Sequence, residues 1–268
     1  MKYYVINRGD ELSLKLADTF HQLAEKHNLV PDPSSPDIVL SIGGDGTMLQ
    51  AFHLFVQQLE NTSFVGIHTG HLGFYADWKP EEIEQLVELM AKPPQKPAVE
   101  YPVAELIITT QNETQTFLAL NEFTIKGIGG TLVAKLHMNN HMFEMFRGDG
   151  ICISTPSGST GYNKSLGGAL IPPSLETIQI TEIASINNRV YRTIGSSMIL
   201  PKHHHCDIYP ISQQKLLLTV DHLQFEYDDI ISIRSQVASK KVRFVRYRPF
   251  PFWHRVREAF ISDDFSEA

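Results

Sequence analysis

The stretch SIGGDGTMLQAF, residues 41–52, places three glycines and one aspartate between two apolar runs. Gly43, Gly44 and Gly46 have no Cβ, so they can adopt positive φ and leave backbone amides open to a ligand. A helix expected from Thr47 onward adds the unpaired N–H groups and the positive dipole end of its first turn. The stretch therefore predicts a phosphate-binding turn between a strand and a helix.

Asp45 is the unexpected member of this turn, because a carboxylate repels phosphate. It could take a proton from an attacking hydroxyl or hold Mg²⁺ beside a triphosphate. It could equally cap the helix that follows, and the turn alone does not decide between these roles. The turn is no Walker A motif, since Gly-Lys-Ser/Thr occurs nowhere in the chain, and Leu49 replaces the third glycine of the dinucleotide fingerprint.

The first hundred residues alternate between short apolar runs and segments with helical periodicity. Strands are expected at residues 3–7, 37–42 and 64–68, and helices at residues 11–27, at 47–59 and from about Pro80. Three strand–helix units in succession predict a parallel sheet covered by helices, a Rossmann-like α/β domain over residues 1–100.

The pattern changes after the proline-rich segment at residues 91–102. The β-rich runs that follow are residues 103–110, 116–126, 131–138, 141–147, 151–155, 177–183, 197–200, 207–211, 216–220, 225–234 and 241–247. So many strands with little helical periodicity predict an antiparallel β-sandwich over residues 101–245. Asn139-Asn140 is a suitable hairpin turn between two of them.

The last segment, residues 246–268, is basic and aromatic. Its rings and arginines could bind nucleic acid. The net charge of −7 favours the alternative, in which the rings of Phe250, Phe252, Trp253 and Phe260 pack onto a domain while the arginines face water.

The composition is that of an ordinary globular protein, with 42% hydrophobic and 20% charged residues. Cys152 and Cys206 are too few for a disulfide framework, and Cys152 lies in an apolar run typical of packing. Because no apolar run approaches the roughly 20 residues of a membrane span, we expect a cytoplasmic protein.

A second glycine-containing stretch, residues 147–170, is too polar for a simple connection between strands. Its hydroxyl and amide groups belong to Ser157, Ser159, Thr160, Tyr162, Asn163 and Ser165. Such groups suit ribose and phosphate oxygens, and a loop of this length inside a compact domain is usually functional.

Five stretches together resemble the NAD kinase family along essentially the whole chain. They are IGGDGT at 42–47, HTGHLGF at 68–74, LNE at 120–122, RGDG at 147–150 and STPSGSTGYNKSLGGAL at 154–170. The resemblance implies transfer of the γ-phosphoryl of ATP to the 2′-hydroxyl of the adenosine ribose of NAD, giving NADP. It also implies an α/β domain and a β-sandwich, with the C-terminal tail returning to the α/β domain. Whether polyphosphate replaces ATP stays open.

The resemblance implies a role for several residues. Asp45 would be the catalytic aspartate at the ribose hydroxyl, and Gly43, Gly44 and Gly46 would surround the ATP phosphates, whose charge Mg²⁺ or another divalent cation would neutralise. The residues implied to bind NAD are Asp45, Gly46, Phe74, Asn121, Glu122, Arg147, Asp149, Thr160, Gly161, Tyr162, Asn163, Lys164, Ser165, Ala184 and His222. Within this set, Phe74 would line the adenine side of the site, Tyr162 would stack on a ring, and Asn163 could hydrogen-bond to an adenine edge.

In the family, several of these residues are contributed across a subunit interface, which implies a homotetramer; Tyr191 and Arg192 could belong to that interface. Two positions depart from the family pattern. Gly161 replaces the usual alanine, and His222 follows Asp221 where glycine is commoner, so that an imidazole narrows the site.

Other functions predict other sequences. A lipid or sugar kinase sharing the GGDG turn would lack the loop at residues 157–165, and a non-catalytic dinucleotide-binding regulator would have replaced Asp45. The histidines at 203–205, and the pair His68 and His71, do not predict zinc, since neighbouring residues on a strand point to opposite faces.

Overall fold

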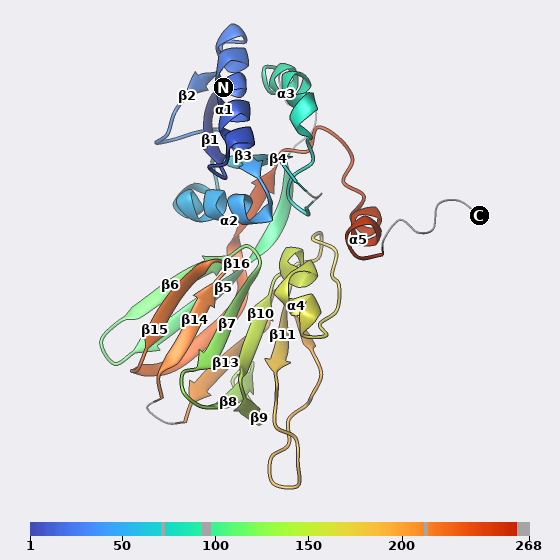
Figure 1. Ribbon diagram of the computed structural model, residues 1–268. Helices are drawn as coiled ribbons and strands as arrows, with labels where there is room; N and C mark the ends of the chain where they lie inside the picture. The colour runs from blue at the N-terminus through green and yellow to red at the C-terminus, as the bar shows by residue number, and fades with distance from the viewer. Residues whose placement is uncertain (71–72, 93–97, 212–213, 262–268) are drawn as a thin grey trace, which may run out of the picture. The chain divides into compact units, whose positions relative to one another are not determined.

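The computed structural model of the chain describes residues 1–70, 73–92, 98–211 and 214–261 (Figure 1). The chain divides into two compact units. The first unit comprises Met1–Glu100 and the segment from Val242 onward, and the second comprises Tyr101–Lys241. Each unit has its own hydrophobic core.

The first unit is built on a parallel sheet with the strand order β2-β1-β3-β4. The strands are β1 (Lys2–Asn7), β2 (Val30–Pro31), β3 (Ile38–Gly43) and β4 (Ser63–His68). Every residue of β3 is buried, as expected for a strand covered on both faces. The predicted α/β fold of this part of the chain is confirmed.

Helices cover both faces of this sheet (Figure 1). They are α1 (Glu11–Lys26), α2 (Asp45–Leu54) and α3 (Ile83–Met90), with short 3₁₀ turns at Val56–Gln58 and Pro80–Glu82. Apolar residues of α1 and α3 share one core with Leu40 and Ile67 of the sheet. A Cβ on Gly66, which alternates with Ile67, would meet Met48 of α2, so α2 covers the opposite face. Because α2 ends at Leu54, the prediction of one helix over residues 47–59 was too long.

The second unit contains two antiparallel sheets. One has the order β12-β11-β10-β7-β14-β15; in the other, β16 is followed by β13, β8 and β9, and β5 pairs with both β16 and β6. The strands are β5 (Val99–Thr110), β6 (Thr114–Ala119), β7 (Glu122–Gly127), β8 (Leu132–Met138), β9 (His141–Gly148), β10 (Gly150–Ser154), β11 (Thr177–Ile183), β12 (Met198–Pro201), β13 (His205–Pro210), β14 (Leu216–Val220), β15 (Leu223–Tyr227) and β16 (Ile230–Phe244). Side chains from both sheets form one core, which confirms the predicted sandwich.

The hairpin between β8 and β9 turns at Asn139 and Asn140, with φ of 49° and 68°. Two successive residues with positive φ are the mark of a tight hairpin turn, and asparagine tolerates this conformation better than most residues. The predicted turn is confirmed.

Strand boundaries were wrong at three places. The run at 116–126 is broken after Ala119, and β7 begins at Glu122. The run at 225–234 is interrupted between Tyr227 and Ile230. From Ile230 the chain stays extended to Phe244, so the expected gap before residue 241 does not exist. The pattern of apolar residues did not predict the two interruptions, because β-forming side chains stand close on both sides of each.

The C-terminal tail forms helix α5 (Phe252–Phe260) within the first unit. The ring centroids of Phe252 and Phe260 lie 6.3 Å and 6.0 Å from that of Phe74. Trp253, expected to be packed, is 59% exposed. The expectation that the arginines face water was wrong for Arg246 and Arg255, whose side chains are 6% and 8% exposed.

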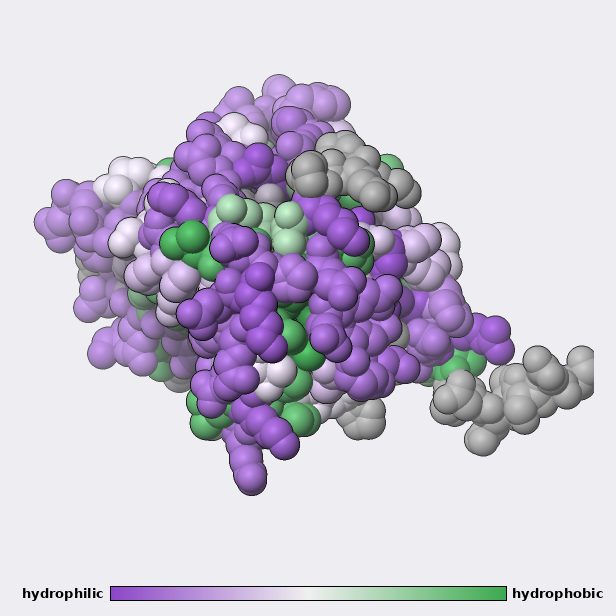
Figure 2. Space-filling view, turned by 90° about the horizontal axis from the view of Figure 1, so that it is seen from above, coloured by the Kyte–Doolittle hydropathy of each residue, from purple (hydrophilic) through white to green (hydrophobic). Residues whose placement is uncertain are grey.

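The face seen in Figure 2 is mostly hydrophilic, with scattered hydrophobic residues. Among the helices of the described ranges, none has the length and apolar character needed to cross a membrane.

Candidate active site

The glycine turn joins β3 to α2 in the first unit. Gly43 ends β3, Gly44 is the N-cap of α2 and Asp45 is its first residue. Among the described residues, no side chain caps this helix. The alternative in which Asp45 serves as the cap is therefore wrong.

The carboxylate of Asp45 instead accepts hydrogen bonds from a distant segment of the first unit. The amide of Phe74 donates to Oδ1 at 3.1 Å and to Oδ2 at 2.9 Å, and the amide of Tyr75 donates to Oδ1 at 3.1 Å. Both donors belong to the backbone, so the position of the carboxylate depends on the course of the chain at residues 73–75. Asp45 is thus held in one orientation at the edge of the turn.

Burial dominates the ionisation of this group. It raises the pKa of Asp45 above its ordinary value, since the charged form loses water. The Phe74 and Tyr75 amides, and the charges of Arg255 and Arg246, act in the opposite direction without reversing the rise. A carboxylate with a raised pKa is a stronger base than an ordinary one, which suits a group that has to accept a proton.

The three glycines of the turn have different surroundings. A Cβ on Gly43 would lie 2.2 Å from Oγ1 of Thr47, whereas a Cβ on Gly44 or Gly46 would meet no described atom within 4 Å. None of the three has positive φ, so the turn uses the missing Cβ of glycine and not its freedom to adopt left-handed backbone. Gly44 and Gly46 leave open space beside the first turn of α2, where the unpaired amides of the helix can meet an anion.

The rest of the stretch at 68–74 is only partly described. Nδ1 of His68 lies 3.0 Å from the carbonyl oxygen of Gly70. His71 and Leu72 lie outside the described residues. Phe74 is half-buried, and its ring faces the aromatic side chains of α5 rather than standing alone.

In the second unit, Asp221 organises the break between β6 and β7. Its carboxylate accepts hydrogen bonds from the amides of Leu120, Asn121 and Glu122, at 2.9, 2.7 and 3.1 Å. Asp221 itself has φ of 52° in the turn between β14 and β15. This turn therefore presents Asn121 and Glu122 in a fixed arrangement, with the exposed His222 as its second residue.

Asp221 also affects the charge of Glu122. Burial, reinforced by the negative charge of Asp221, raises the pKa of Glu122 to about 8. Oε2 of Glu122 is buried and has no hydrogen-bond partner among the described residues. A buried acceptor of this kind is suited to a hydroxyl donor supplied by a ligand.

The polar stretch at 154–170 folds tightly against the same break. It contains a 3₁₀ turn (Ser157–Thr160) and the short helix α4 (Tyr162–Ser165). Thr155 and Ser157 donate through their hydroxyls to the carbonyl oxygen of Leu120. A Cβ on Gly158 would lie 2.1 Å from the carbonyl oxygen of Asn121, so only glycine fits there.

Several polar groups of this stretch make hydrogen bonds within the protein. The hydroxyls of Ser159, Thr160 and Ser165 donate to backbone carbonyls. Asn163 is completely buried; its Oδ1 accepts a hydrogen bond from Thr181, and its Nδ2 has no partner in the described ranges. Through these contacts the serines and Asn163 support the fold of the polar stretch. Their residue types did not predict this role.

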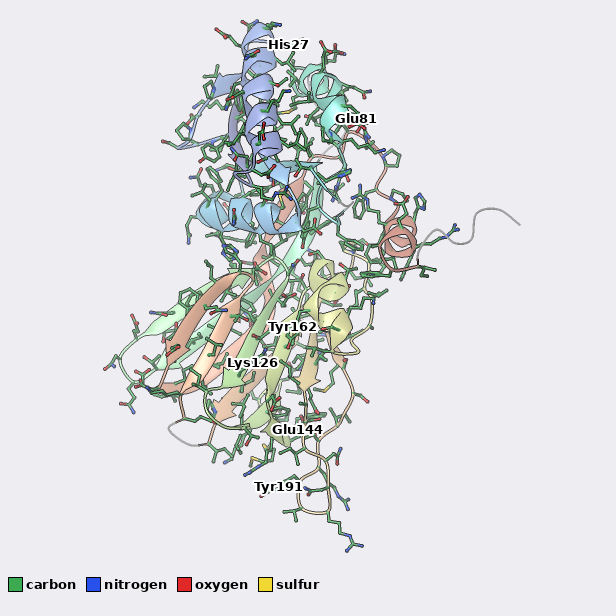
Figure 3. The ribbon with its side chains drawn as sticks, viewed as in Figure 1. His27, Glu81, Lys126, Glu144, Tyr162 and Tyr191 are labelled. Carbon is green, nitrogen blue, oxygen red and sulfur yellow. The ribbon has the colours of Figure 1, made fainter. Side chains whose placement is uncertain are left out.

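Tyr162 lies beside Lys126 of β7 (Figure 3). Nζ of Lys126 donates to the tyrosine hydroxyl at 3.2 Å and lies 5.0 Å from the ring centroid. Nothing in the sequence singled out Lys126, because a single lysine in a strand is usually a solvated residue. Lys164, by contrast, is exposed on the same short helix as Tyr162.

Arg147 lies near the end of β9, and Ala184 directly follows β11 in the other sheet of the second unit. The carbonyl oxygen of Arg147 accepts a hydrogen bond from the amide of Ile186 at 2.8 Å. The guanidinium of Arg147 stacks on the ring of Tyr191, with its Cζ 4.3 Å from the ring centroid. Ala184 has φ of 47° and is exposed, as is Asp149. Backbone hydrogen bonds from Asp149 to Ile183 and from Ile186 to Arg147 thus bring these three positions close together.

Two carboxylates, Glu144 and Glu182, hold the segment that carries Tyr191. Glu144 and Tyr191 are labelled in Figure 3. Glu144 accepts a hydrogen bond from the amide of Ile194, and Glu182 accepts from Thr193 and the amide of Gly195. Burial, with the nearby charge of Glu182, raises the pKa of Glu144 to about 7. Neither carboxylate was singled out from the sequence.

A glycine-rich turn between a strand and a helix N-terminus, together with a buried polar loop in a β-sandwich, defines a protein suited to binding a phosphorylated ligand. A family model described as the ATP-NAD kinase N-terminal domain matches residues 20–94, and one described as the ATP-NAD kinase C-terminal domain matches residues 120–247. The chain belongs to the NAD kinase family.

Named relatives agree with this assignment. NAD kinase 1 of Bacillus anthracis is 54% identical over 265 residues, covering 98% of this chain and 100% of the relative. NAD kinase 1 of Bacillus subtilis (strain 168) is 54% identical over 264 residues, covering 98% and 99%.

Solved structures share the fold at low sequence identity. The yeast NADH kinase complexed with NADH has a TM-score of 0.81 at 17% identity, covering 100% of this chain and 89% of that one. An NAD kinase from Archaeoglobus fulgidus in complex with ATP has a TM-score of 0.75 at 19% identity, covering 96% and 99%.

The predicted activity is thereby confirmed: the protein phosphorylates NAD to NADP with ATP. The lipid-kinase, sugar-kinase and regulator alternatives are not favoured.

Proposed function

We propose that Asp45 is the catalytic base of this NAD kinase. The 2′-oxygen of the adenosine ribose forms a bond to the γ-phosphorus of ATP, the bond to the β,γ-bridging oxygen breaks, and ADP leaves. Asp45 accepts the proton of the 2′-hydroxyl as the new bond forms. The observation that carries the proposal is the carboxylate of Asp45, which is held by two amides of residues 74 and 75 and does not cap α2.

The glycine turn supplies the phosphate site in this proposal. Gly44 and Gly46 leave space for ATP phosphates beside the first turn of α2, and Gly43 permits the close approach of Thr47. Because the turn has no lysine, a divalent cation, most simply Mg²⁺, neutralises phosphate charge when bound with ATP.

The residues present are compatible with such a cation. Within the described ranges, no group of three His, Cys, Asp or Glu residues could form a metal cage. Mg²⁺ that arrives with a nucleotide takes most of its ligands from phosphates and water and needs only one or two carboxylates. In this proposal Asp45 serves as the base, and the phosphates of ATP together with water supply the ligands of the cation.

NAD binding falls to the second unit in this proposal. Glu122, whose buried Oε2 has no partner in the described part of the chain, accepts a hydrogen bond from a sugar hydroxyl, and Asn121 contacts the dinucleotide beside it. Tyr162 offers a ring for stacking. The remaining members of the proposed set are Gly46, Phe74, Arg147, Asp149, Thr160, Gly161, Asn163, Lys164, Ser165, Ala184 and His222. Of these, Asn163 acts by supporting α4, since it is buried.

We further propose a cytoplasmic homotetramer in which Arg147, Asp149 and Ala184 serve the site of a neighbouring subunit. Exposure of Asp149 and Ala184 supports this arrangement. Sedimentation of the purified chain should give the tetramer mass, and Tyr191→Ala should weaken the assembly.

The acceptor hydroxyl can be tested directly. Incubation with NAD, ATP and Mg²⁺ should yield NADP. NAD that lacks the 2′-hydroxyl should bind with similar affinity and give no phosphorylated product. Phosphorylation of that analogue would show that another hydroxyl is the acceptor and would refute the chemistry given to the site.

A further inference from the structure

A buried ion cluster lies beneath the segment that holds Asp45, entirely within the first unit. It consists of Asp77, Arg246 and Arg255, and is called the Asp77 cluster below. Nη1 of Arg246 lies 2.5 Å from Oδ2 of Asp77, and Nη2 of Arg255 contacts Oδ1. The side chain of Asp77 is only 2% exposed. The two arginines come from the C-terminal segment, about 170 residues further along the chain.

The same arginines also bind the backbone of the segment that holds Asp45. Nη1 of Arg255 donates to the carbonyl oxygens of Gly73, at 2.8 Å, and Ala76, at 2.9 Å. Nη1 of Arg246 donates to the carbonyl oxygen of Tyr75 at 3.3 Å. The carbonyls of this short segment therefore point to the arginines, while its amides at 74 and 75 point to the carboxylate of Asp45.

We propose that Arg255 and Arg246 are positioning residues for phosphoryl transfer, which fix residues 73–76 so that the amides of Phe74 and Tyr75 hold the carboxylate of Asp45. The proposal rests on the catalytic role proposed for Asp45. Neither arginine needs to touch NAD or ATP. A guanidinium suits this task, because its rigid fork of donors can bind a carboxylate and two carbonyls at once.

The charges of the cluster add a second effect. Among the described residues that surround Asp45, the positive groups acting on it are Arg255 and Arg246, and both lower its pKa against the effect of burial. Asp77 is the carboxylate that pairs with them. Loss of one guanidinium charge should therefore raise the pKa of Asp45 further, and less of the enzyme would hold the base in its charged form at a given pH.

The tail provides a matched control. Arg248 is also a tail arginine with ionic and aromatic contacts, since it pairs with Glu82 at 3.0 Å and lies 3.7 Å from the ring centroid of Trp78. The charges that lower the pKa of Asp45 are those of Arg255 and Arg246. Arg248 donates instead to the carbonyl oxygen of Asp77 at 3.4 Å, outside residues 73–76. Arg248→Gln should thus weaken the tail without disturbing the carboxylate.

The test compares Arg255→Gln, Arg255→Lys and Arg248→Gln in the full-length protein. Arg255→Gln should lower kcat by about tenfold or more, with KM for NAD changed by about twofold at most. It should also move the acid limb of the kcat profile to higher pH. Arg255→Lys, which keeps the charge and loses the fork, should leave the acid limb in place and recover part of kcat. Arg248→Gln should keep the kcat and the acid limb of the parent enzyme, even if its Tm is lower.

The proposal would be overturned by an Arg255→Gln enzyme with parental kcat and acid limb, or by the same shift in Arg248→Gln. If Arg255→Gln does not fold, Arg246→Gln decides by the same criteria. The role of Asp45 itself is judged separately: if Asp45→Asn abolishes turnover while Arg255→Gln and Arg246→Gln do not impair it, only the positioning fails.

Discussion

Gly73 lies against Asp45 so closely that a Cβ on Gly73 would be 2.2 Å from Oδ1 and 2.6 Å from the carboxyl carbon of Asp45. No side chain fits between these two residues. Gly73 also precedes the residue whose amide donates to both carboxylate oxygens. The orientation of Asp45 thus depends on the lack of a side chain at residue 73.

Gly73→Ala should therefore displace the carboxylate of Asp45. We expect kcat for NADP formation to fall by about tenfold or more, because a small misplacement of a catalytic group is costly. Gly70→Ala is the control, since a Cβ there meets no described atom within 4 Å and φ is not positive. Equal activity of the two variants in a steady-state assay would contradict the geometry given to Asp45.

Gly158 and Gly161 form a second matched pair. A Cβ on Gly158 would lie 2.1 Å from the carbonyl oxygen of Asn121, whereas one on Gly161 would lie 3.3 Å from the carbonyl oxygen of Gly158 and 3.5 Å from Oε2 of Glu122. Gly158→Ala should lower the free energy of unfolding by about 1–3 kcal/mol or more. Gly161→Ala should change it by no more than about 1 kcal/mol. Denaturant titration of both variants measures which of them is less stable. A Gly158→Ala variant as stable as the parent protein would contradict the close contact assigned to Gly158.

Asp221→Gly should disorder the break at residues 120–122. Glycine accepts the φ of 52° but provides no acceptor for the three amides, so we expect a loss of about 1–3 kcal/mol and a higher KM for NAD. Asp221→Asn keeps one oxygen acceptor and tolerates the backbone, and it should retain more of both properties. Unfolding curves and NAD titrations would contradict this assignment if Asp221→Gly matched the parent protein.

Glu122→Gln should change how stability depends on pH. The carboxyl of Glu122 has an ordinary pKa of 4.5 and a pKa of about 8 in the fold, so between these values the folded chain keeps a proton that the unfolded chain loses. The contribution of Glu122 to stability is therefore present below 4.5 and is lost as pH rises towards 8. At pH above 8, Glu122→Gln should have a higher Tm than the parent protein, and the difference should shrink below pH 4.5. A difference in Tm that is constant with pH would show that Glu122 does not titrate in this way.

The sequence predicted the fold well where its signals were local. Helical periodicity identified α1, and Asn139-Asn140 identified a hairpin, because both depend on neighbouring residues. The breaks near residues 120 and 228 were missed. At the first of them the chain is turned by the carboxylate of Asp221, about 100 residues further along, and no local pattern reports such a contact.

The same limit applies to the site. Asp45 could be singled out because an acid in a phosphate turn is chemically unusual. Arg246 and Arg255 could not, since a basic tail with solvated arginines and one with buried arginines have the same composition. Only the buried Asp77 beside these arginines shows that they are not solvated. The serines at 157 and 159 were misjudged for a related reason: a hydroxyl that binds ribose and one that binds a buried carbonyl look alike in the sequence.

The most direct test of the account is the turnover of Asp45→Asn, measured together with its affinity for NAD. Asparagine keeps the size of the side chain and one oxygen for the amides of Phe74 and Tyr75, but it cannot accept the proton of the ribose hydroxyl. We predict that NAD binding stays measurable by calorimetry while NADP formation falls by about a hundredfold or more. Turnover equal to that of the parent enzyme would contradict the catalytic role of Asp45.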